Sequence, residues 1–277
     1  MSEDFGATTA VPLGATAASR AELAATYHQK GWVKLPQLLD EDELTTINAN
    51  IAEAIERPEY AQKSTGNKYD QTSEDYQRVM RVYRALSAGY PEVDALVRRL
   101  GPLVGELNGW EHTRLWQDRL FIKPGSDFGS KPTNWHQDVK LPLDRRGWCT
   151  VWIAMVDVPK SRGPMTFLNG SHRLGSLGNI EQLKHNYDLS ELVGEHDWKV
   201  LDGCESGAPL AAGDATMHTM LTLHRAGENH DVEDRVILAV SYFDANQLYT
   251  GSPNVVTDNI GLKVFEPFEH ENFPIVG

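Results

Sequence analysis

The sequence of 277 residues contains little cysteine, no long apolar run and few basic residues relative to acidic ones. Its two cysteines, Cys149 and Cys204, are too few for a disulfide framework or a cysteine-based zinc site, so we expect both to stay reduced. No apolar run reaches the roughly 18–20 residues that a membrane span needs. Residues 1–20 lack the basic and apolar regions of a secretion signal, and we therefore expect a cytoplasmic protein with no membrane partner.

The charge balance of the chain is acidic. The 26 Lys and Arg residues against 39 Asp and Glu residues give a formal charge of −13. Sequence-independent binding of nucleic acid needs basic side chains to neutralise phosphates, so we expect no nucleic-acid partner. The hydrophobic content of 40% and the charged content of 23% are ordinary for a folded protein with a sizeable core. These values favour a protein that acts on small molecules.

The chain is helical in its N-terminal part and rich in strands thereafter. Residues 1–17 are typical of a disordered arm, and residues 18–277 are predicted to form a single domain. Helices are predicted over 19–30 with Ser19 as the N-cap, after Asp40, and over 79–106 with a break at Pro91. Strands are predicted over 32–35, 116–123, 148–156 and 236–243, with a polar insert over 176–207. This mainly β pattern with flanking helices favours a sandwich or barrel core with the helices outside.

The first motif with chemical meaning is Thr133-Asn134-Trp135-His136-Gln137-Asp138. On a strand, residues two apart point to the same face, so His136 and Asp138 would lie a few ångströms apart. An imidazole and a carboxylate are two of the three ligands in the 2-His-1-carboxylate sites that bind non-haem Fe(II). Because His-x-Asp occurs often by chance, a third ligand elsewhere in the chain decides whether a metal site is present.

Two histidines further along the chain compete for the place of the third ligand. His218 and His224 are six residues apart, and both would lie on one face if the segment stays extended. Arg235 follows His224 by eleven residues, at the start of an apolar strand. From there a guanidinium could reach into the same barrel and bind a carboxylate through two hydrogen bonds.

Together these motifs resemble the phytanoyl-CoA dioxygenase family of Fe(II)- and 2-oxoglutarate-dependent oxygenases. The resemblance covers about residues 20–245 and is most specific over 116–243. Order and spacing agree for Trp135-His136-Gln137-Asp138, Trp152-Ile153-Ala154-Met155, Gly163-Pro164-Met165, Asn169-Gly170-Ser171-His172-Arg173, Gly213-Asp214, His224-x-x-Gly227-x-Asn229 and Arg235. The resemblance implies a double-stranded β-helix core (a cupin-like jelly roll), which agrees with the mainly β pattern.

The resemblance also implies a set of iron ligands, namely His136, Asp138 and His224. The offset of eleven residues between His224 and Arg235 matches the family, whereas the offset of seventeen from His218 does not. Arg235 resembles the arginine that pairs with the distal carboxylate of 2-oxoglutarate in the family.

Three further residues match positions near the cosubstrate in the family. Trp152 matches a tryptophan that flanks 2-oxoglutarate, and Thr133 and Gln117 fall where related enzymes place contacts to it. The chain departs from the family after the distal histidine, where Arg225 and Ala226 stand in place of a small Gly-Ser pair. We therefore expect Arg225 to point at substrate or at solvent.

The implied reaction oxidises an unactivated C–H bond of a small molecule. Fe(II) would be the cofactor, 2-oxoglutarate the cosubstrate and O2 the oxidant, with succinate and CO2 as products. Halogenases of this superfamily have Gly or Ala in place of the carboxylate ligand, so Asp138 argues against halogenation. Epimerisation, cyclisation or desaturation at the same iron centre remains an alternative. A cupin-like isomerase or a ligand-binding jelly roll is an alternative of another class, which Arg235 disfavours because neither needs a carboxylate clamp.

The substrate is expected to be a secondary metabolite. A short acidic chain without a targeting segment fits the family's bacterial natural-product branch, and hence antibiotic biosynthesis, better than lipid metabolism. A charge of −13 would repel the phosphates of an acyl-CoA. We therefore expect a bulky, oxygen-rich, neutral or cationic substrate, such as a glycosylated or polyketide metabolite.

Overall fold

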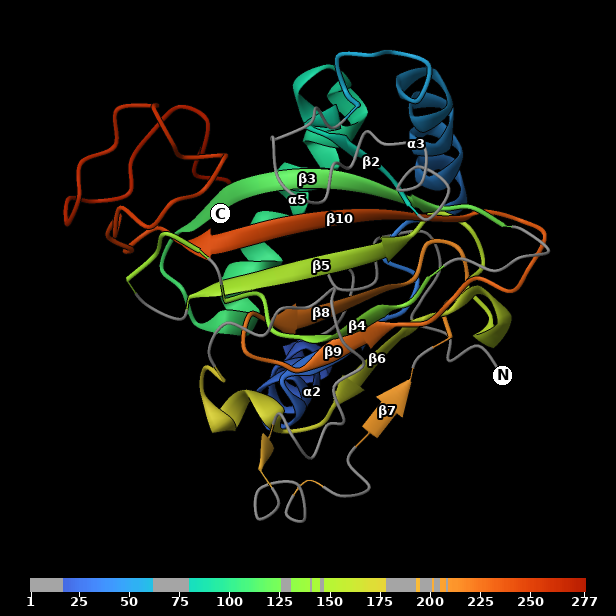
Figure 1. Ribbon diagram of the computed structural model, residues 1–277, viewed down its shortest axis with the longest axis horizontal. Coiled ribbons are helices and arrows are strands. Elements are labelled where there is room, and N and C mark those ends of the chain that lie inside the picture. Colours follow the sequence, from blue (N-terminus) through green and yellow to red (C-terminus); the bar gives the residue numbers. More distant parts are fainter. Residues whose placement is uncertain are drawn as a thin grey trace.

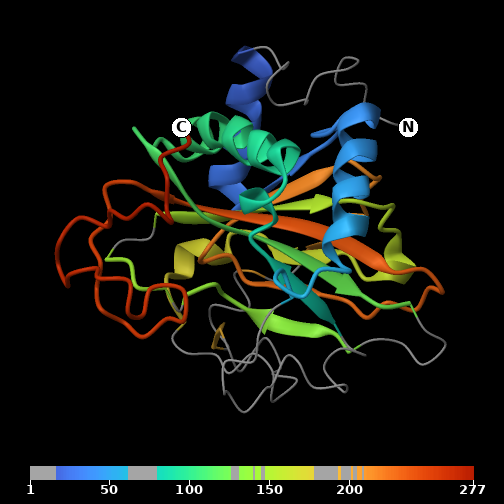
Figure 2. The same ribbon diagram turned by 90° about the horizontal axis from the view of Figure 1, so that it is seen from above.

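Two antiparallel β-sheets face each other in the computed structural model, and three α-helices cover the outer face of the larger sheet (Figures 1 and 2). The structure describes residues 17–61, 80–125, 131–139, 141–144, 147–177, 193–194, 201, 205–207 and 209–277. Residues 1–16 of the arm expected over 1–17, and most of the insert over 176–207, lie outside these ranges, whereas residue 17 is the first of a helix. The arrangement confirms a mainly β, jelly-roll fold with flanking helices.

The larger sheet has six strands and the smaller sheet has four. The larger sheet runs in the order β1 (Trp32–Leu35), β8 (Ala215–Thr219), β5 (Trp148–Ala154), β10 (Arg235–Asp244), β3 (Thr113–Lys123) and β2 (Arg81–Arg84). The smaller sheet runs in the order β4 (Thr133–His136), β9 (His224–Ala226), β6 (Met165–Leu168) and β7 (Glu205–Gly207). Short 3-10 helices cover Leu86–Ala88, Lys160–Arg162 and Ser171–Leu174.

The first two helices lie close to their predicted positions. Helix α2 (Ala17–Lys30) ends at Gly31, whose φ of +83° favours glycine. The predicted N-cap at Ser19 was wrong, because the helix begins two residues earlier and includes Ser19. Helix α3 (Glu41–Ala54) begins after Asp40 as predicted, and a capping box explains why: Asp40 accepts from the amide of Glu43, whose side chain accepts from the amide of Asp40.

The predicted helix over 79–106 was wrong in its first part. Helix α5 (Pro91–Asn108) begins at Pro91, where the missing N–H costs no hydrogen bond. The residues before it form strand β2, which extends the larger sheet by pairing with β3. Two buried residues, Val82 and Tyr83, lie between two half-buried arginines in this strand, and four residues were too few for the periodicity to distinguish a strand from a helix.

Strand β5 contributes side chains to two cores, one between the larger sheet and the helices and one between the two sheets. All seven of its residues are buried. Cys149, Val151 and Ile153 point to one face of the sheet and pack with the three helices. Trp152 and Ala154 point the other way, into the core between the two sheets. A central strand that is buried on both faces holds Trp152 in a fixed position inside the roll.

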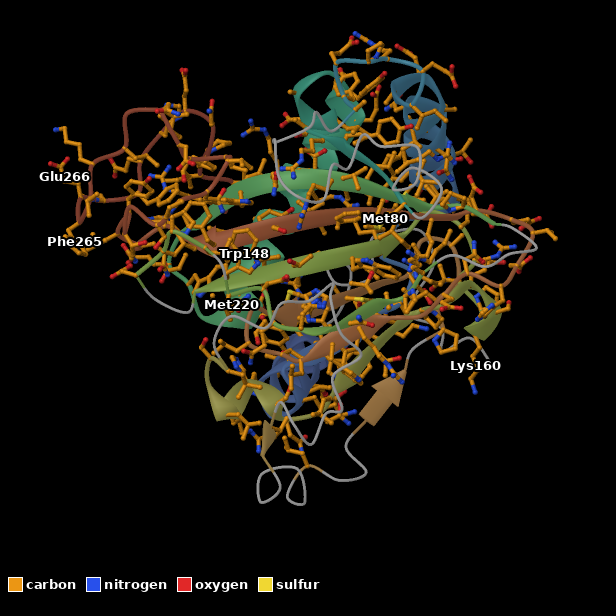
Figure 3. The ribbon with its side chains drawn as sticks, in the orientation of Figure 1. Met80, Trp148, Lys160, Met220, Phe265 and Glu266 are labelled. Carbon is orange, nitrogen blue, oxygen red and sulfur yellow. The ribbon has the colours of Figure 1, made fainter. Side chains whose placement is uncertain are left out.

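The chain after β10 folds back against the end of the larger sheet, as the left side of Figure 1 shows. Its anchor is an aromatic cluster in which Trp116 stacks on Phe273 with ring centroids 5.0 Å apart. Phe265 lies on the outer rim of this segment, and Trp148 lies near the end of the sheet that the segment covers (Figure 3). No helix among the described residues is long and apolar enough to cross a membrane.

Candidate metal centre and its cavity

Two of the predicted iron ligands are direct neighbours across the smaller sheet. His136 at the end of β4 is the register partner of His224 at the start of β9. Their ring centroids lie 4.0 Å apart. The next residue, Arg225, is exposed, because successive side chains of a strand alternate between faces. Its guanidinium carbon lies 4.9 Å from the ring of Trp135.

Backbone carbonyls fix the tautomer of both imidazoles. His136 Nδ1 lies 2.8 Å from the carbonyl oxygen of Asn134, and His224 Nδ1 lies 2.9 Å from that of Thr222. A carbonyl can only accept, so each Nδ1 carries the proton and donates. Each Nε2 therefore keeps its lone pair, which is the form that binds a metal ion.

Asp138 completes the cluster from just beyond the end of β4. Its backbone amide donates to the carbonyl of Met220 over 2.8 Å, which places its side chain beside the two imidazoles. One carboxylate oxygen, Oδ1, lies 3.9 Å from Nε2 of His136. Ligand atoms of His136, Asp138 and His224 all lie within 4.8 Å of one another. Two imidazole nitrogens and one carboxylate oxygen on one side of a cavity fit a non-haem Fe(II) ion.

Gln137, between two of these residues, points away from the cluster and holds the surrounding loops. Its side-chain NH2 donates to the carbonyls of Leu221 and Gly175 over 2.7 and 2.9 Å, and its amide oxygen accepts from the backbone N–H of Leu177. The contact to Leu221 ties the turn before His224 to the strand that carries His136.

The electrostatics favour the protonation states that metal binding needs. Burial raises the pKa of Asp138, but the neighbouring His218, His224 and His136 outweigh burial and hold this pKa below its ordinary value. Burial lowers the pKa of His136, against the opposing effect of Asp138. Burial and the two neighbouring imidazoles place the pKa of His224 well below its ordinary value. The carboxylate is therefore ionised and both imidazoles are neutral near pH 7.

His218 lies next to the cluster but comes from the other sheet. The segment from His218 to His224 does not stay extended, because a turn closed by the amide of Thr222 on the carbonyl of Thr219 carries the chain from β8 to β9. The rings of His218 and His224 are nevertheless 4.3 Å apart. His218 Nε2 lies 3.6 Å from Oδ2 of Asp138, the oxygen other than the one near His136.

Arg235 lies at the start of β10, buried in the same cavity. Its guanidinium carbon lies 5.5 Å from the ring of Trp152, and Nη1 donates to the carbonyl of Gly163. Its Nε has no hydrogen-bond partner in the structure. Burial lowers its pKa to about 10, so it is charged at neutral pH. A buried cation with an unused donor fits one end of a dicarboxylate such as 2-oxoglutarate.

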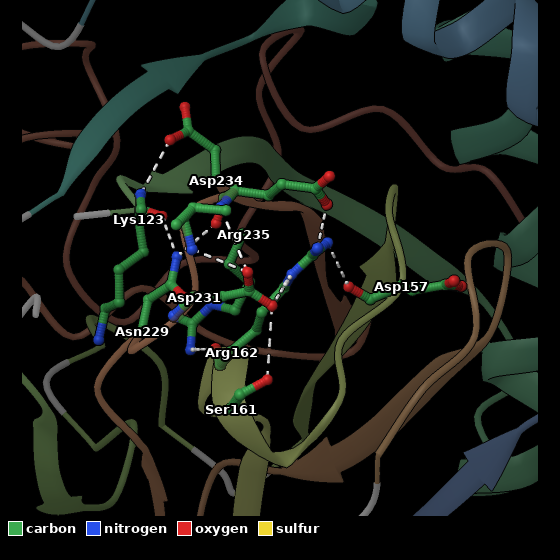
Figure 4. A network of polar contacts seen from close by, with 11 residues as sticks. Lys123, Asp157, Ser161, Arg162, Asn229, Asp231, Asp234 and Arg235 are labelled. Atoms are coloured by element: carbon green, nitrogen blue, oxygen red, sulfur yellow. Dashed lines mark hydrogen bonds and ion pairs between the residues drawn. The ribbon is translucent and has the colours of Figure 1, made fainter. Parts of the chain in front are cut away.

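A polar network fixes the chain on both sides of Arg235 (Figure 4). Arg162 Nε lies 3.1 Å from Asp231, and Asn229 donates to the backbone carbonyls of Lys123 and Glu233. Lys123 is buried beside Arg235, and its Nζ donates to the carbonyls of Lys131 and Gly227. Burial, together with the charge of Arg235, lowers the pKa of Lys123 to about 6.

The cavity around the cluster, of about 250 Å³, is called here the inner cavity. Three further predicted residues line it, namely Arg235, Trp152 and Thr133. Gln117 does not line it; this residue accepts from Arg84 and lines an adjoining outer cavity of about 230 Å³. Sequence reasoning missed the lining residues Met80, Val82, Arg84, Arg119 and Phe121. The first three are spaced two residues apart, which places side chains on one face of a strand, so predicting a strand here would have found them.

Comparisons with known proteins agree with this geometry. The family model described as Phytanoyl-CoA dioxygenase (PhyH) matches residues 27–236. A probable alpha-ketoglutarate-dependent hypophosphite dioxygenase from Stutzerimonas stutzeri is 25% identical over 234 residues, which cover 82% of this chain and 79% of that protein. The epimerase SnoN, solved with Fe3+, alpha ketoglutarate and nogalamycin RO, superposes with a TM-score of 0.77 at 26% identity, covering 95% of this chain and 100% of that chain. The carbocyclase SnoK from nogalamycin biosynthesis gives a TM-score of 0.76 at 26% identity, covering 98% and 100%.

Proposed function

The chain belongs to the phytanoyl-CoA dioxygenase family of Fe(II)- and 2-oxoglutarate-dependent dioxygenases, and on that premise we propose that it oxidises an unactivated C–H bond of a small secondary metabolite. One observation carries this proposal. A 2-His-1-carboxylate cluster and a buried arginine line the same cavity, although they come from different sheets.

In this proposal the cluster holds the metal and Arg235 holds the cosubstrate. His136, His224 and Asp138 occupy one side of the ion and leave positions open for other ligands. The guanidinium of Arg235 binds the distal carboxylate, with Trp152 beside it and Thr133 as a further contact. Bound iron with 2-oxoglutarate and O2 supplies the oxidising power for attack on a C–H bond, with succinate and CO2 as co-products.

The chain's own contribution is orientation and the exclusion of water. Trp152, Met165 and Phe167 belong to the apolar core between the sheets, and the first two line the inner cavity. Apolar walls around the cluster keep bulk water away and strengthen the contact between Arg235 and a carboxylate. Strands β4 and β9 hold the two imidazoles and β10 holds Arg235, so we expect little reorganisation when substrate binds.

A second outcome at the same centre is epimerisation, cyclisation or desaturation. The similarity to the epimerase SnoN and the carbocyclase SnoK favours this second candidate. Their association with nogalamycin supports a polyketide or glycosylated metabolite as the substrate of this chain, and a role in antibiotic biosynthesis.

The proposed function is tested by following 2-oxoglutarate in air. Wild-type protein with Fe(II) should release succinate, and the Asp138→Ala variant should release none. A panel of glycosylated and polyketide metabolites is then screened by mass. Gain of one oxygen atom identifies hydroxylation, loss of two hydrogens identifies cyclisation or desaturation, and an unchanged mass with altered chromatographic retention identifies epimerisation. No succinate from wild-type protein with any panel member would contradict the proposal.

A further inference from the structure

The motif from Asn169 to Arg173 matches the family but lines neither the inner nor the outer cavity. Its serine, Ser171, is completely buried at the start of a 3-10 helix. The hydroxyl of Ser171 donates to the backbone carbonyl of Leu168 over 2.7 Å and accepts from the backbone N–H of Leu223 over 2.8 Å. Ser171 therefore connects the segment after β6 to the residue that directly precedes β9.

A single peptide group links Ser171 to the imidazole of His224. The N–H of Leu223 and the carbonyl of Thr222 belong to the same peptide unit, which is planar, so the two groups point in opposite directions. The N–H edge of this unit donates to Ser171, and the carbonyl edge lies 2.9 Å from Nδ1 of His224. Any rotation of the peptide plane moves both edges together. A hydrogen bond that fixes the N–H edge therefore also fixes the acceptor that holds the Nδ1 proton.

The hydrogen bonds along this path all run in one direction. Nδ1 of His224 donates to the carbonyl of Thr222 at one end. The hydroxyl of Ser171 donates to the carbonyl of Leu168 at the other end. Donors aligned in this way polarise one another, which strengthens each bond in a buried environment. A stronger bond at Nδ1 makes Nε2 of His224 a more basic metal ligand.

Loss of the Ser171 hydroxyl would leave a buried donor without its partner. Leu223 is fully buried, and an unsatisfied N–H there carries the full desolvation penalty. Rotation of the peptide towards another acceptor would then lower the free energy and take its carbonyl away from Nδ1 of His224. The other imidazole is held separately, since Nδ1 of His136 lies 2.8 Å from the carbonyl oxygen of Asn134 within β4.

We propose that Ser171 is a positioning residue for His224. It holds the peptide between Thr222 and Leu223 so that Nδ1 keeps its proton and Nε2 is free to bind the metal. The inference rests on the proposed function, because that function makes His224 a ligand of the metal. It also gives a role at the metal centre to a motif that does not line the cavities.

The test reads the tautomer of His224 directly in metal-free protein. Long-range proton–nitrogen correlation spectra at about pH 8, above the ordinary histidine pKa, show which ring nitrogen carries the proton. Wild-type protein should show Nδ1–H at both His224 and His136. Ser171→Ala should shift His224 towards the Nε2–H form and leave His136 unchanged. Ser171→Cys preserves the shape of the side chain, but its sulfur accepts weakly, so it should shift His224 in the same direction.

Metal affinity is the second readout. Fe(II) binding is measured anaerobically by competition with a chelator. Both Ser171 variants should bind Fe(II) about 10- to 100-fold more weakly than wild-type protein, the effect typical of losing a contact that orients a metal ligand. Tyr242→Phe is the control, because it also removes a buried hydroxyl that donates to a backbone carbonyl, that of Val97, but on the helix side of the larger sheet. Its Fe(II) affinity and histidine tautomers should equal those of wild-type protein.

Several results would overturn the assignment. They are an Nε2–H tautomer at His224 in wild-type protein, an unchanged His224 tautomer or an unchanged Fe(II) affinity in both Ser171 variants, and an equal effect in Tyr242→Phe. An equal shift at His136 would show a general loosening of the site and would also overturn it. Because the tautomer is read without metal, it is independent of turnover. If the His224 tautomer and the Fe(II) affinity both depend on Ser171 but wild-type protein releases no succinate, the positioning role stands and the oxygenase function fails.

Discussion

Replacing Arg235 by lysine should weaken 2-oxoglutarate binding while leaving the metal in place. Arg235 is only 3% exposed, and its Nη1 donates to the carbonyl of Gly163. Nε is without a partner, and the planar group lies against Trp152. An arginine held in this way can give a carboxylate two parallel hydrogen bonds, whereas a lysine ammonium acts as a point charge.

The size of the effect follows from the loss of one charge-assisted hydrogen bond. Such a bond contributes about 1.5–3 kcal/mol, and each 1.4 kcal/mol changes a dissociation constant tenfold. We therefore expect Arg235→Lys to bind 2-oxoglutarate roughly 10- to 100-fold more weakly than wild-type protein. Fe(II) affinity should stay close to the wild-type value, because Arg235 does not belong to the ligand cluster.

The assay is an anaerobic titration of the Fe(II)-loaded protein with 2-oxoglutarate, followed by the metal-to-ligand charge-transfer absorption. Arg225→Lys is a matched control, since Arg225 follows His224 directly but is exposed and lies against Trp135. An unchanged affinity in Arg235→Lys would remove this residue from the cosubstrate site. An equal loss in Arg225→Lys would show that the effect is general and not specific to the buried guanidinium.

Three further predictions test other parts of the site. His224→Ala should lose Fe(II) and all turnover, whereas His218→Ala should keep measurable turnover; iron retained by His224→Ala and lost by His218→Ala would reverse the assignment. Lys123→Met should flatten the rise of unfolding free energy with pH. Its pKa is about 6 when folded against about 10.4 unfolded, so the unfolded chain binds more protons in between and stability rises by up to about 1.4 kcal/mol per pH unit. Chemical denaturation at about pH 7 and about pH 9 measures this slope, and equal slopes in both proteins would refute it. Cys149, whose thiol pKa is raised by burial, should resist alkylation in a Cys204→Ser background until the protein unfolds; labelling of the native protein would contradict this.

The cluster could be predicted from sequence because the motif and the fold constrain the same residues. Asp138 and His136 are two apart, and His224 is paired with His136 by the register of β4 and β9. Local sequence patterns do not show that these two strands pair. The family resemblance was what identified His224 as the partner of His136 and Asp138. The assignment of these residues as ligands stays a prediction until a metal is observed on them.

Two helix boundaries could also be predicted from local sequence. The helix after Asp40 begins where the Asp40 side chain caps it, and the first helix ends before Gly31, which has a positive φ. The Gly213-Asp214 motif, which also matches the family, has a structural role. Asp214 accepts from the amides of Gln37 and Ala211, so its carboxylate joins β1 and β8 through their flanking turns rather than serving the site.

Features that depend on pairing between distant strands could not be predicted from the sequence. Strand β2 was assigned to a helix because its four residues carry no preference that outweighs pairing with β3. That error hid Arg84, which lines the inner cavity. The turn between His218 and His224 was hidden for a similar reason, since the hydrogen bond from Thr222 to Thr219 forms only where the chain passes from one sheet to the other. Most of the 176–207 insert lies outside the described residues, so the prediction of a polar insert there stays untested.

An anomalous diffraction map would locate the iron and identify its ligands directly. Crystals grown anaerobically with Fe(II) and 2-oxoglutarate would be measured at the iron absorption edge. We expect one peak per chain, bonded to Nε2 of His136, Nε2 of His224 and a carboxylate oxygen of Asp138, with the distal carboxylate of 2-oxoglutarate on Arg235. A peak bonded to His218 in place of His224, or 2-oxoglutarate bound away from Arg235, would contradict it.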